Sequence, residues 1–272
     1  MNANKPLVNC VVGISVSEAT DLESLGFDRL DLNRAIVRLS ELFLSAGARI
    51  AFGHDWRPGG VMEAVATLAV KYAEFPRVQN GSISVRNCPI INRVAFPDIP
   101  FLKRDCPSTE ENEDSPSSMA RLLRGIVDSK QSRKPENGER TKALSLMRQE
   151  LSRLCDIRIC FGGNAVNFEG RIPGVLEEAL GSIENNKLLL VGSIFGGVSK
   201  MIVDCVDRDY INEGISSPKF SKEIERLRIW ARNRVKILSR EEERRLWYSV
   251  STEEYSELVL RAAVKYWQSR HA

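Results

Sequence analysis

Short apolar segments alternate with amphipathic segments in the first part of the chain. Residues 7–14 (LVNCVVGI) and 49–52 (RIAF) are apolar runs that predict buried strands. Between them, residues 28–46 carry apolar side chains at helical spacing, and Gly47 follows as a candidate C-terminal cap. Helical spacing returns over residues 61–72. This order of strand, helix, strand and helix predicts a parallel sheet with right-handed crossovers.

The same alternation returns in the second half of the chain. A helix is expected over 139–154, a strand over 157–161, a helix over 175–183 and a strand over 188–191. Only charged helices are expected after residue 220, over residues 221–239, 240–248 and 253–268. The chain is therefore predicted to be an α/β protein with a Rossmann-like, doubly wound, mainly parallel sheet and a helical C-terminal end.

The middle of the chain has a different composition. Short strands are expected at 83–85 and 94–96, where nearby prolines limit their length. From 107 to 137 the sequence is dominated by Ser, Glu, Asp, Asn, Lys and Pro, which predicts a mobile surface insertion. The simplest interpretation of this segment is a solvated loop without chemistry. We therefore expect one domain over residues 1–272 with an insertion at 107–137.

Composition excludes several classes of function. The chain is 43% hydrophobic and 28% charged, with a formal net charge of +3, so it lacks the overall basic charge typical of nucleic-acid-binding proteins. No segment approaches the roughly 20 apolar residues of a membrane helix, and no signal peptide is visible, so a cytoplasmic protein is expected. The six cysteines form no CxxC pair, and we expect no disulfide framework, no metal site and no cofactor.

Four predicted strands end in small or polar residues at the point where a ligand would bind. In an open parallel sheet, ligands bind outside the carboxyl ends of the strands, at the place where the strand order reverses. Helix N-termini carry unpaired N–H groups and partial positive charge there, so they bind phosphate. Glycine permits close approach of the backbone to a ligand, or a positive φ angle.

The turn after the second strand is RPGG at 57–60, followed by Glu63. Arg57 could pair with a phosphate through two hydrogen bonds, and Gly59 and Gly60 would let the backbone approach it. Glu63 would lie in the first helical turn, where its carboxylate either bonds ribose hydroxyls or favours the helix dipole. The alternative interpretation is a tight turn with a capping carboxylate.

A similar combination follows the strand at 157–161. The turn GGN at 162–164 leads to GRIPGVLEE at 170–178, which again contains arginine, Pro-Gly and a glutamate at a helix start. Glu177 and Glu178 are adjacent and face different directions, so only one is expected to face a ligand. The candidate ligand-binding residues of this segment are Gly162, Gly163, Asn164, Arg171, Gly174 and Glu178.

Two further turns complete the set. Residues 192–197 (GSIFGG) end in Gly196 and Gly197, and residues 13–17 (GISVS) contain hydroxyls that could donate to phosphate or ribose. Each glycine turn is a weak signal alone. Four at successive strand ends predict one pocket for a nucleotide, with Gly13, Ser15 and Ser17 from the first strand.

At these residues the chain resembles the SLOG superfamily, whose branches include DNA-binding Smf-type proteins, LOG-type enzymes and related sensor domains. The similar stretches are GISVSE (13–18), GHDWRPGG (53–60), ICFGGNAVNFEGRIPGVLEEAL (159–180) and LLLVGSIFGG (188–197). The tail LSREEERRLW (238–247) is similar to the end of such domains in the subset found with prokaryotic antiviral defence systems.

The resemblance implies two functions. LOG-type enzymes hydrolyse the N-glycosidic bond of a nucleoside 5′-monophosphate through a PGGxGTxxE motif, and Glu178 aligns with its glutamate and Gly174 with one of its glycines. Residues 170–172 (GRI) replace Pro-Gly-Gly, and Val175 replaces threonine. If the chain is an enzyme, Glu178 and Arg171 are the catalytic candidates. The defence-associated branch implies instead a receptor for an ADP-ribose-type nucleotide signal.

Sensing is the preferred prediction, and hydrolysis of a nucleotide is the alternative. In the sensor, Ser15, Arg57, Gly59, Gly60, Asn164 and Arg171 would hold phosphates and ribose, with Glu63 and Glu178 on hydroxyls. Binding of single-stranded DNA is not favoured, because the net charge is small. No effector module is visible in the sequence. We therefore predict that the sensor acts as a homo-oligomer, with the C-terminal helices as candidate contacts, or with a separate effector protein.

Overall fold

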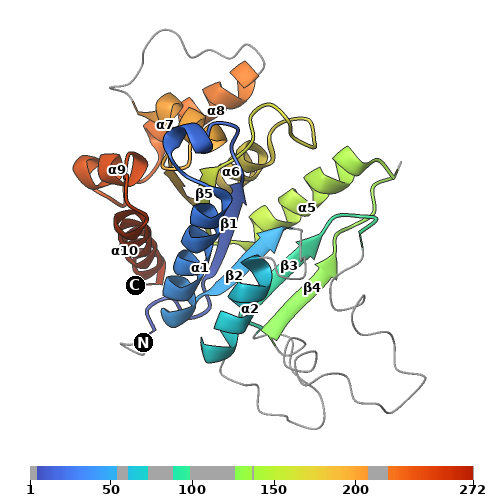
Figure 1. Ribbon diagram of the computed structural model, residues 1–272, viewed down its shortest axis with the longest axis horizontal. Helices are drawn as coiled ribbons and strands as arrows, with labels where there is room; N and C mark the ends of the chain where they lie inside the picture. Colours follow the sequence, from blue (N-terminus) through green and yellow to red (C-terminus); the bar gives the residue numbers. More distant parts are fainter. Residues whose placement is uncertain are drawn as a thin grey trace.

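The computed structural model describes residues 5–53, 61–72, 88–98, 126–136, 138–207 and 220–271. Within these ranges, six parallel strands form one sheet that is covered by helices on both faces (Figure 1). The predicted Rossmann-like α/β class is confirmed. None of the helices in the described ranges has the length and apolar character needed to cross a bilayer.

The sheet has a central strand from which the chain winds in both directions. The strands are β1 (Val11–Ser17), β2 (Arg49–Gly53), β3 (Ile90–Val94), β4 (Val127–Gln131), β5 (Ile157–Gly162) and β6 (Leu188–Gly192). Their order is β4-β3-β2-β1-β5-β6, and every adjacent pair is parallel. The chain moves from β1 towards β4 and then returns to β5 on the other side. The strand order therefore reverses between β1 and β5, where ligands bind in open α/β sheets.

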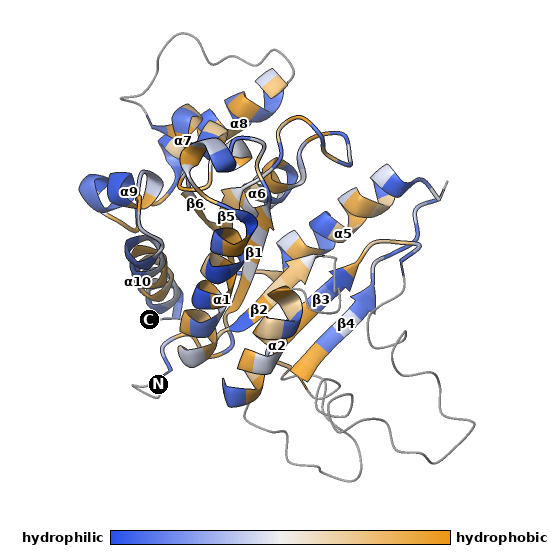
Figure 2. Cartoon of the chain, viewed as in Figure 1, coloured by the Kyte–Doolittle hydropathy of each residue, from blue (hydrophilic) through white to orange (hydrophobic). Residues whose placement is uncertain are grey.

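Helices from two parts of the chain cover the two faces. One face packs against α1 (Arg29–Ser45), α2 (Val61–Tyr72) and α10 (Thr252–His271). The other face packs against α5 (Arg140–Leu154), α6 (Gly174–Glu184), α7 (Gly197–Val206) and α8 (Ser221–Asn233). The short helix η1 (Glu23–Leu25) follows β1 in the chain, and the short helix α9 (Arg240–Trp247) packs beside β6. In Figure 2 the edge strand β4 is mainly hydrophilic after its first residue, and α9 is mainly hydrophilic as well.

Alternation along β1 separates apolar packing from polar chemistry. Val12 and Ile14 point to the face that carries α1 and join its apolar core. Gly13 and Ser15 point to the opposite face, towards α5 and α6. The period of two therefore places a small residue and a hydroxyl directly beneath α6, and this arrangement builds the candidate site.

Three expectations need correction. The predicted insertion at 107–137 contains the edge strand β4, and the strand expected at 94–96 is β3, at 90–94. Both strands carry buried polar pairs that hide the apolar pattern: Arg93 bonds Asp128 at 3.1 Å, and Asn92 bonds Ser129 at 3.1 Å. Helix α7 was not expected, because the glycine turn before it dominated the pattern. The strand expected at 83–85 lies outside the described residues.

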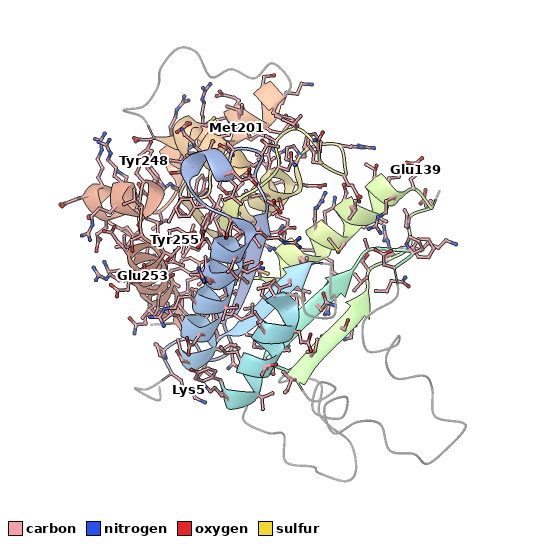
Figure 3. The ribbon with its side chains drawn as sticks, viewed as in Figure 1. Lys5, Glu139, Met201, Tyr248, Glu253 and Tyr255 are labelled. Atoms are coloured by element: carbon pink, nitrogen blue, oxygen red, sulfur yellow. The ribbon has the colours of Figure 1, made fainter. Side chains whose placement is uncertain are left out.

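The C-terminal helix α10 packs one aromatic ring against the last strand. Tyr255 is 1% exposed and lies beside Gly192, where an added Cβ would come within 2.8 Å of the tyrosine Cζ (Figure 3). Its ring also meets Phe161 edge-on, with centroids 6.2 Å apart. Gly192 therefore provides the space into which α10 docks.

We expect Tyr255→Phe to change the free energy of unfolding by less than about 1 kcal/mol, because the buried hydroxyl has no hydrogen-bond partner in the described part of the chain. Tyr255→Ala should cost about 3–5 kcal/mol, because it removes the whole ring from the core. Urea unfolding of both variants measures the difference. A Phe variant as unstable as the Ala variant would contradict this account.

Candidate functional site

The ends of β1 and β5 bring four of the predicted residues together. The Gly163 N–H donates to the Ser17 carbonyl at 2.7 Å, and the Asn164 N–H lies 3.3 Å from the Ser17 hydroxyl. Gly162 has a φ of +64°, and a Cβ there would lie 2.5 Å from the Ser17 carbonyl oxygen. Ser17, Gly162, Gly163 and Asn164 are therefore neighbours at the reversal point, and their contact with a ligand stays a prediction.

The Asn164 side chain shapes the loop that follows. Its Oδ1 accepts the N–H groups of Val166 at 2.9 Å and Asn167 at 2.8 Å. The amide oxygen is thus engaged within the loop between β5 and α6. Any contact of Asn164 with a ligand must come from its side-chain NH2 or its backbone.

The glycine turn before α7 binds a carboxylate of the chain itself. The Gly197 N–H donates to Asp21 Oδ1 at 2.9 Å, and the Val198 N–H donates to the Gly163 carbonyl at 2.9 Å. The Gly196 N–H is used as well, by the Ser193 carbonyl at 2.8 Å. A phosphate at this turn would have to displace the Asp21 carboxylate, and the contact of Gly196 and Gly197 with a ligand stays a prediction. Their N–H groups join the ends of β1, β5 and β6.

Glu178 is the fifth residue of α6, and its side chain belongs to a buried polar network between α6 and the sheet. Its Oε2 accepts the Ser15 hydroxyl and also the Arg158 Nη1, at 3.0 Å. The Arg158 side chain is 0% exposed and the Glu178 side chain 12%. The Arg158 Nη1 also donates to the Ser15 hydroxyl oxygen at 3.2 Å, so each of the three side chains is hydrogen-bonded to the other two.

Gly13 provides space for this network. A Cβ at position 13 would lie 2.6 Å from both the Arg158 Cζ and the Cys155 Sγ. Gly13 lies within β1, four residues before the end of the strand, rather than in the turn. We therefore assign it to the packing of Arg158, and its contact with a ligand stays a prediction.

The N-terminus of α6 differs from that of α7, because no acceptor caps it. Pro173 is the N-cap residue and provides no side-chain hydrogen bond. In the described ranges, the N–H groups of Gly174, Val175 and Leu176 have no acceptor. A helix end of this kind carries partial positive charge and unpaired donors, which favour an anion.

Arg148, from α5, places a second positive group at the same point. Its guanidinium fills the space beside Gly174, where a Cβ would lie 2.7 Å from Nη2, and it pairs with Glu177 at 2.6 Å. The Arg148 side chain is 11% exposed. A guanidinium and a helix N-terminus repel each other electrostatically, and Glu177 compensates for only part of that charge. Of the two adjacent glutamates, Glu177 meets Arg148 and Glu178 meets Arg158.

A basic cavity of about 670 Å³ lies next to this helix end. Arg171 lines it, together with residues from the segment after β4 and from α5. Its charged lining residues are Arg133, Lys134, Lys142 and Arg171, with Glu136 and Glu177 as the carboxylates. Four cations and two carboxylates leave a positive cavity, which suits an anionic ligand.

Part of the predicted site lies outside the described residues. Arg57, Gly59 and Gly60 belong to this group. Glu63 is described and lies in the first turn of α2, directly after that segment. Its role towards a ligand stays a prediction.

Sequence reasoning missed Arg158, Arg148 and Asp21. Arg158 was visible as an arginine within an otherwise apolar strand, IRICF, a position where a charge needs a buried partner. Asp21 and Arg148 gave no comparable signal, because their partners are 176 and 29 residues away. Only the fold brings these pairs together.

The described cysteines are buried and free: Cys10, Cys88, Cys155, Cys160 and Cys205. Burial raises the pKa of the Cys160 thiol to about 12, so it stays protonated at neutral pH beside Ser15. Among the described residues, no group of three His, Cys, Asp or Glu side chains could hold a metal ion.

The family match agrees with this geometry. A family model described as SLOG cluster2 matches residues 6–223, which is most of the chain. The chain belongs to this SLOG family. The SLOG membership predicted from the glycine turns is thereby confirmed, and it indicates a nucleotide-related function in the broad sense. No curated protein matches the chain significantly. Helices α9 and α10 lie beyond the matched residues.

Proposed function

We propose that this SLOG protein is a sensor that binds a nucleotide-derived ligand of the ADP-ribose type at the carboxyl edge of the sheet. A phosphate would accept the free N–H groups at the start of α6, with Arg148 beneath it and Arg171 beside it. The observation that carries the proposal is the uncapped N-terminus of α6, which lies beside a positive cavity.

A comparison of the N-termini of α6 and α7 supports the choice of α6. At α7 the first N–H groups already bind Asp21 and the Gly163 carbonyl. At α6 they have no acceptor among the described residues, and two arginines lie near them. A phosphate at α6 would therefore gain hydrogen bonds without first displacing a carboxylate of the protein.

The environment of Glu178 favours binding over hydrolysis. A catalytic general base must have a lone pair directed at water, and a general acid must carry a proton at working pH. One oxygen of Glu178 already accepts hydrogen bonds from the Ser15 hydroxyl and the fully buried Arg158 guanidinium, so this oxygen is not directed at water. These contacts give Glu178 a positioning role, holding α6 against β1 and β5.

The remaining predicted residues complete the proposed pocket. Ser17 and Asn164 lie at the reversal point, where ribose or a second phosphate would bind. Arg57, Gly59 and Gly60 follow β2 in the sequence, and their contact with the ligand, like that of Glu63, is part of the proposal. Assembly into a homo-oligomer, or with a separate effector, is proposed as the output and is testable by light scattering with and without ligand.

The experiment that tests the function is a thermal-shift screen of nucleoside monophosphates, ADP-ribose and cyclic ADP-ribose forms, followed by chromatography of every hit after incubation. A ligand at 100 times its Kd should stabilise the fold by about 2.7 kcal/mol. We expect an ADP-ribose-type hit that is recovered intact. Release of free base, abolished by Glu178→Gln, would instead establish the N-glycosidase alternative.

A further inference from the structure

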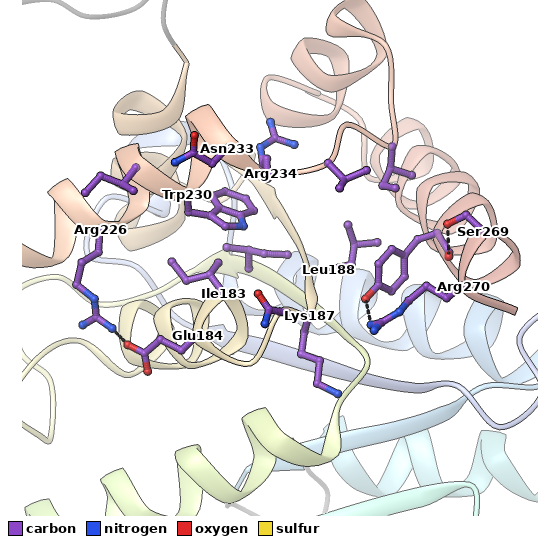
Figure 4. Close-up of a pocket in the computed structure, with 16 residues that line it drawn as sticks. Ile183, Glu184, Lys187, Leu188, Arg226, Trp230, Asn233, Arg234, Ser269 and Arg270 are labelled. Atoms are coloured by element: carbon purple, nitrogen blue, oxygen red, sulfur yellow. Dashed lines mark hydrogen bonds and ion pairs between the residues drawn. The ribbon is translucent and has the colours of Figure 1, made fainter.

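A second large cavity lies at the amino-terminal ends of the strands, whereas the proposed nucleotide site lies at their carboxyl ends. It has a volume of about 680 Å³ and lies between the end of α6, the start of β6, α8 and the end of α10 (Figure 4). Leu188 begins β6 at this cavity, whereas the proposed nucleotide site lies beyond the carboxyl ends of the strands. The two sites are therefore separated by the length of the sheet.

The walls of this cavity are apolar and unusually exposed. Ile229 is 48% exposed and Val235 79% exposed, and both line the cavity together with Trp230 and Tyr266. Large aliphatic side chains are seldom left this open to water when they lie together around a hollow. A volume between about 300 and 1,000 Å³ is typical of cavities that hold small molecules.

Most of the outer wall lies beyond the residues that match the family. The match ends at residue 223, and the cavity residues from Arg226 to Ile237 and from Tyr266 to Arg270 follow it. The inner wall, from Ile183 to Leu189, belongs to the matched domain. The cavity is thus formed jointly by residues of the matched part and by residues that follow it in the chain.

The charges around the cavity are mainly positive. Lys187, Arg226, Arg234 and Arg270 line it, and Glu184 is the one lining carboxylate. Arg226 pairs with Glu184, and Arg234 pairs with Glu243 while stacking 5.0 Å over the Trp230 ring. Arg270 donates to the Tyr266 hydroxyl at 2.7 Å and makes no ion pair within the described ranges. Lys187 pairs with Asp156 at 3.6 Å, so Arg270 is the lining cation that has no ion pair in the described part of the chain.

From this geometry we propose that the cavity binds a small amphipathic anion, with an apolar body and one carboxylate, sulfonate or phosphate group. The apolar body would pack between Trp230, Val235 and Tyr266. The anionic group would pair with Arg270 and accept the Tyr266 hydroxyl. This site is independent of the proposed nucleotide site, because none of its lining residues belongs to that edge.

The test uses anilinonaphthalene sulfonate as a fluorescent probe and decanoate as a competitor. We expect saturable binding at one site, displacement by decanoate, and no displacement by decylammonium, which carries the opposite charge. The probe should also raise the melting temperature, because a ligand of the native state stabilises it. A probe that binds partly unfolded protein would lower the melting temperature and would overturn the proposal.

Matched variants locate the site. Val235→Asp and Arg270→Glu should each weaken probe binding by about tenfold or more, because each places a carboxylate where the anion or its apolar body lies. Val250→Asp and Arg232→Glu are the controls: Val250 is 86% exposed, Arg232 is exposed on α8, and neither lines the cavity. Equal affinity in all four variants would overturn the proposal. So would a dimer that sedimentation detects in the wild type and that Val235→Asp dissociates, because a second copy would then occupy the cavity.

Discussion

Arg158→Met should lower the free energy of unfolding by about 3–5 kcal/mol, because it leaves the Glu178 carboxylate without its guanidinium partner in a site that is largely shielded from water. Removing one member of a buried ion pair costs far more than the pair contributes, since the remaining charge keeps its desolvation penalty. Urea unfolding measures the loss. Chemical denaturation is suitable, because the variant is expected to remain folded without urea.

Two further variants make this prediction specific to the ion pair. Arg158→Met combined with Glu178→Met should recover much of the lost stability, because no buried charge is then left unpaired. Arg153→Met, at an exposed arginine on α5, should change stability by less than about 0.5 kcal/mol. A loss below about 1 kcal/mol in Arg158→Met, or a double variant less stable than the single one, would contradict the network.

Gly197→Ala is expected to cost about 3 kcal/mol or more. Gly197 has a φ of +59°, and an added Cβ would collide with the Gly163 carbonyl and lie 2.7 Å from the Ala19 Cβ. The left-handed conformation costs an alanine about 1–2 kcal/mol, and the backbone must also move apart. The junction of the β1, β5 and β6 loops would therefore open.

Gly26 provides the matched control. It also has a positive φ, of +82°, but an added Cβ would meet nothing within 4 Å. Gly26→Ala should therefore cost only the conformational part, about 1–2 kcal/mol. Thermal and urea unfolding of both variants should separate the two costs. Equal losses of unfolding free energy in the two variants would show that the close approach of Gly197 to Gly163 adds no steric cost, which would contradict this account.

The periodicity of the sequence predicted most of the fold, and the failures have a physical cause. Strands with apolar side chains on both faces, such as β6, are recognisable because a parallel sheet buries both faces. β3 and β4 are parallel too, but they bury Arg93 and Asn92 against polar partners on the neighbouring elements. A pattern of apolar residues cannot distinguish such a strand from a polar loop.

The glycines predicted the positions where the backbone packs closely against another group. They did not predict whether that group is a ligand, a side chain or another backbone segment. Gly163 lies at the reversal point of the sheet, as the turn pattern indicated. Gly13 and Gly174 make room for arginines of the chain, and Gly197 meets another backbone segment. Neighbouring residues in sequence do not reveal such partners, because the contacts join separate parts of the chain.

The arginines near the candidate site were also predicted only in part from the sequence. Arg171 was identified because it follows a glycine in a strand-to-helix loop, and it lines the basic cavity. Arg148 was not identified, because it lies within an amphipathic helix whose arginines are usually solvated. Its side chain is nevertheless 11% exposed and lies against the start of α6.

The measurement that tests the central claim most directly is a calorimetric titration of ADP-ribose into the wild type, Arg171→Glu and the control Arg153→Glu. Arg171 lines the cavity next to the start of α6, whereas Arg153 lies exposed near the other end of α5. We predict binding to the wild type and to Arg153→Glu with the same Kd, and at least about tenfold weaker binding to Arg171→Glu, because a carboxylate replaces a phosphate partner. Equal affinity for all three proteins, or no binding to the wild type, would contradict the proposed nucleotide site.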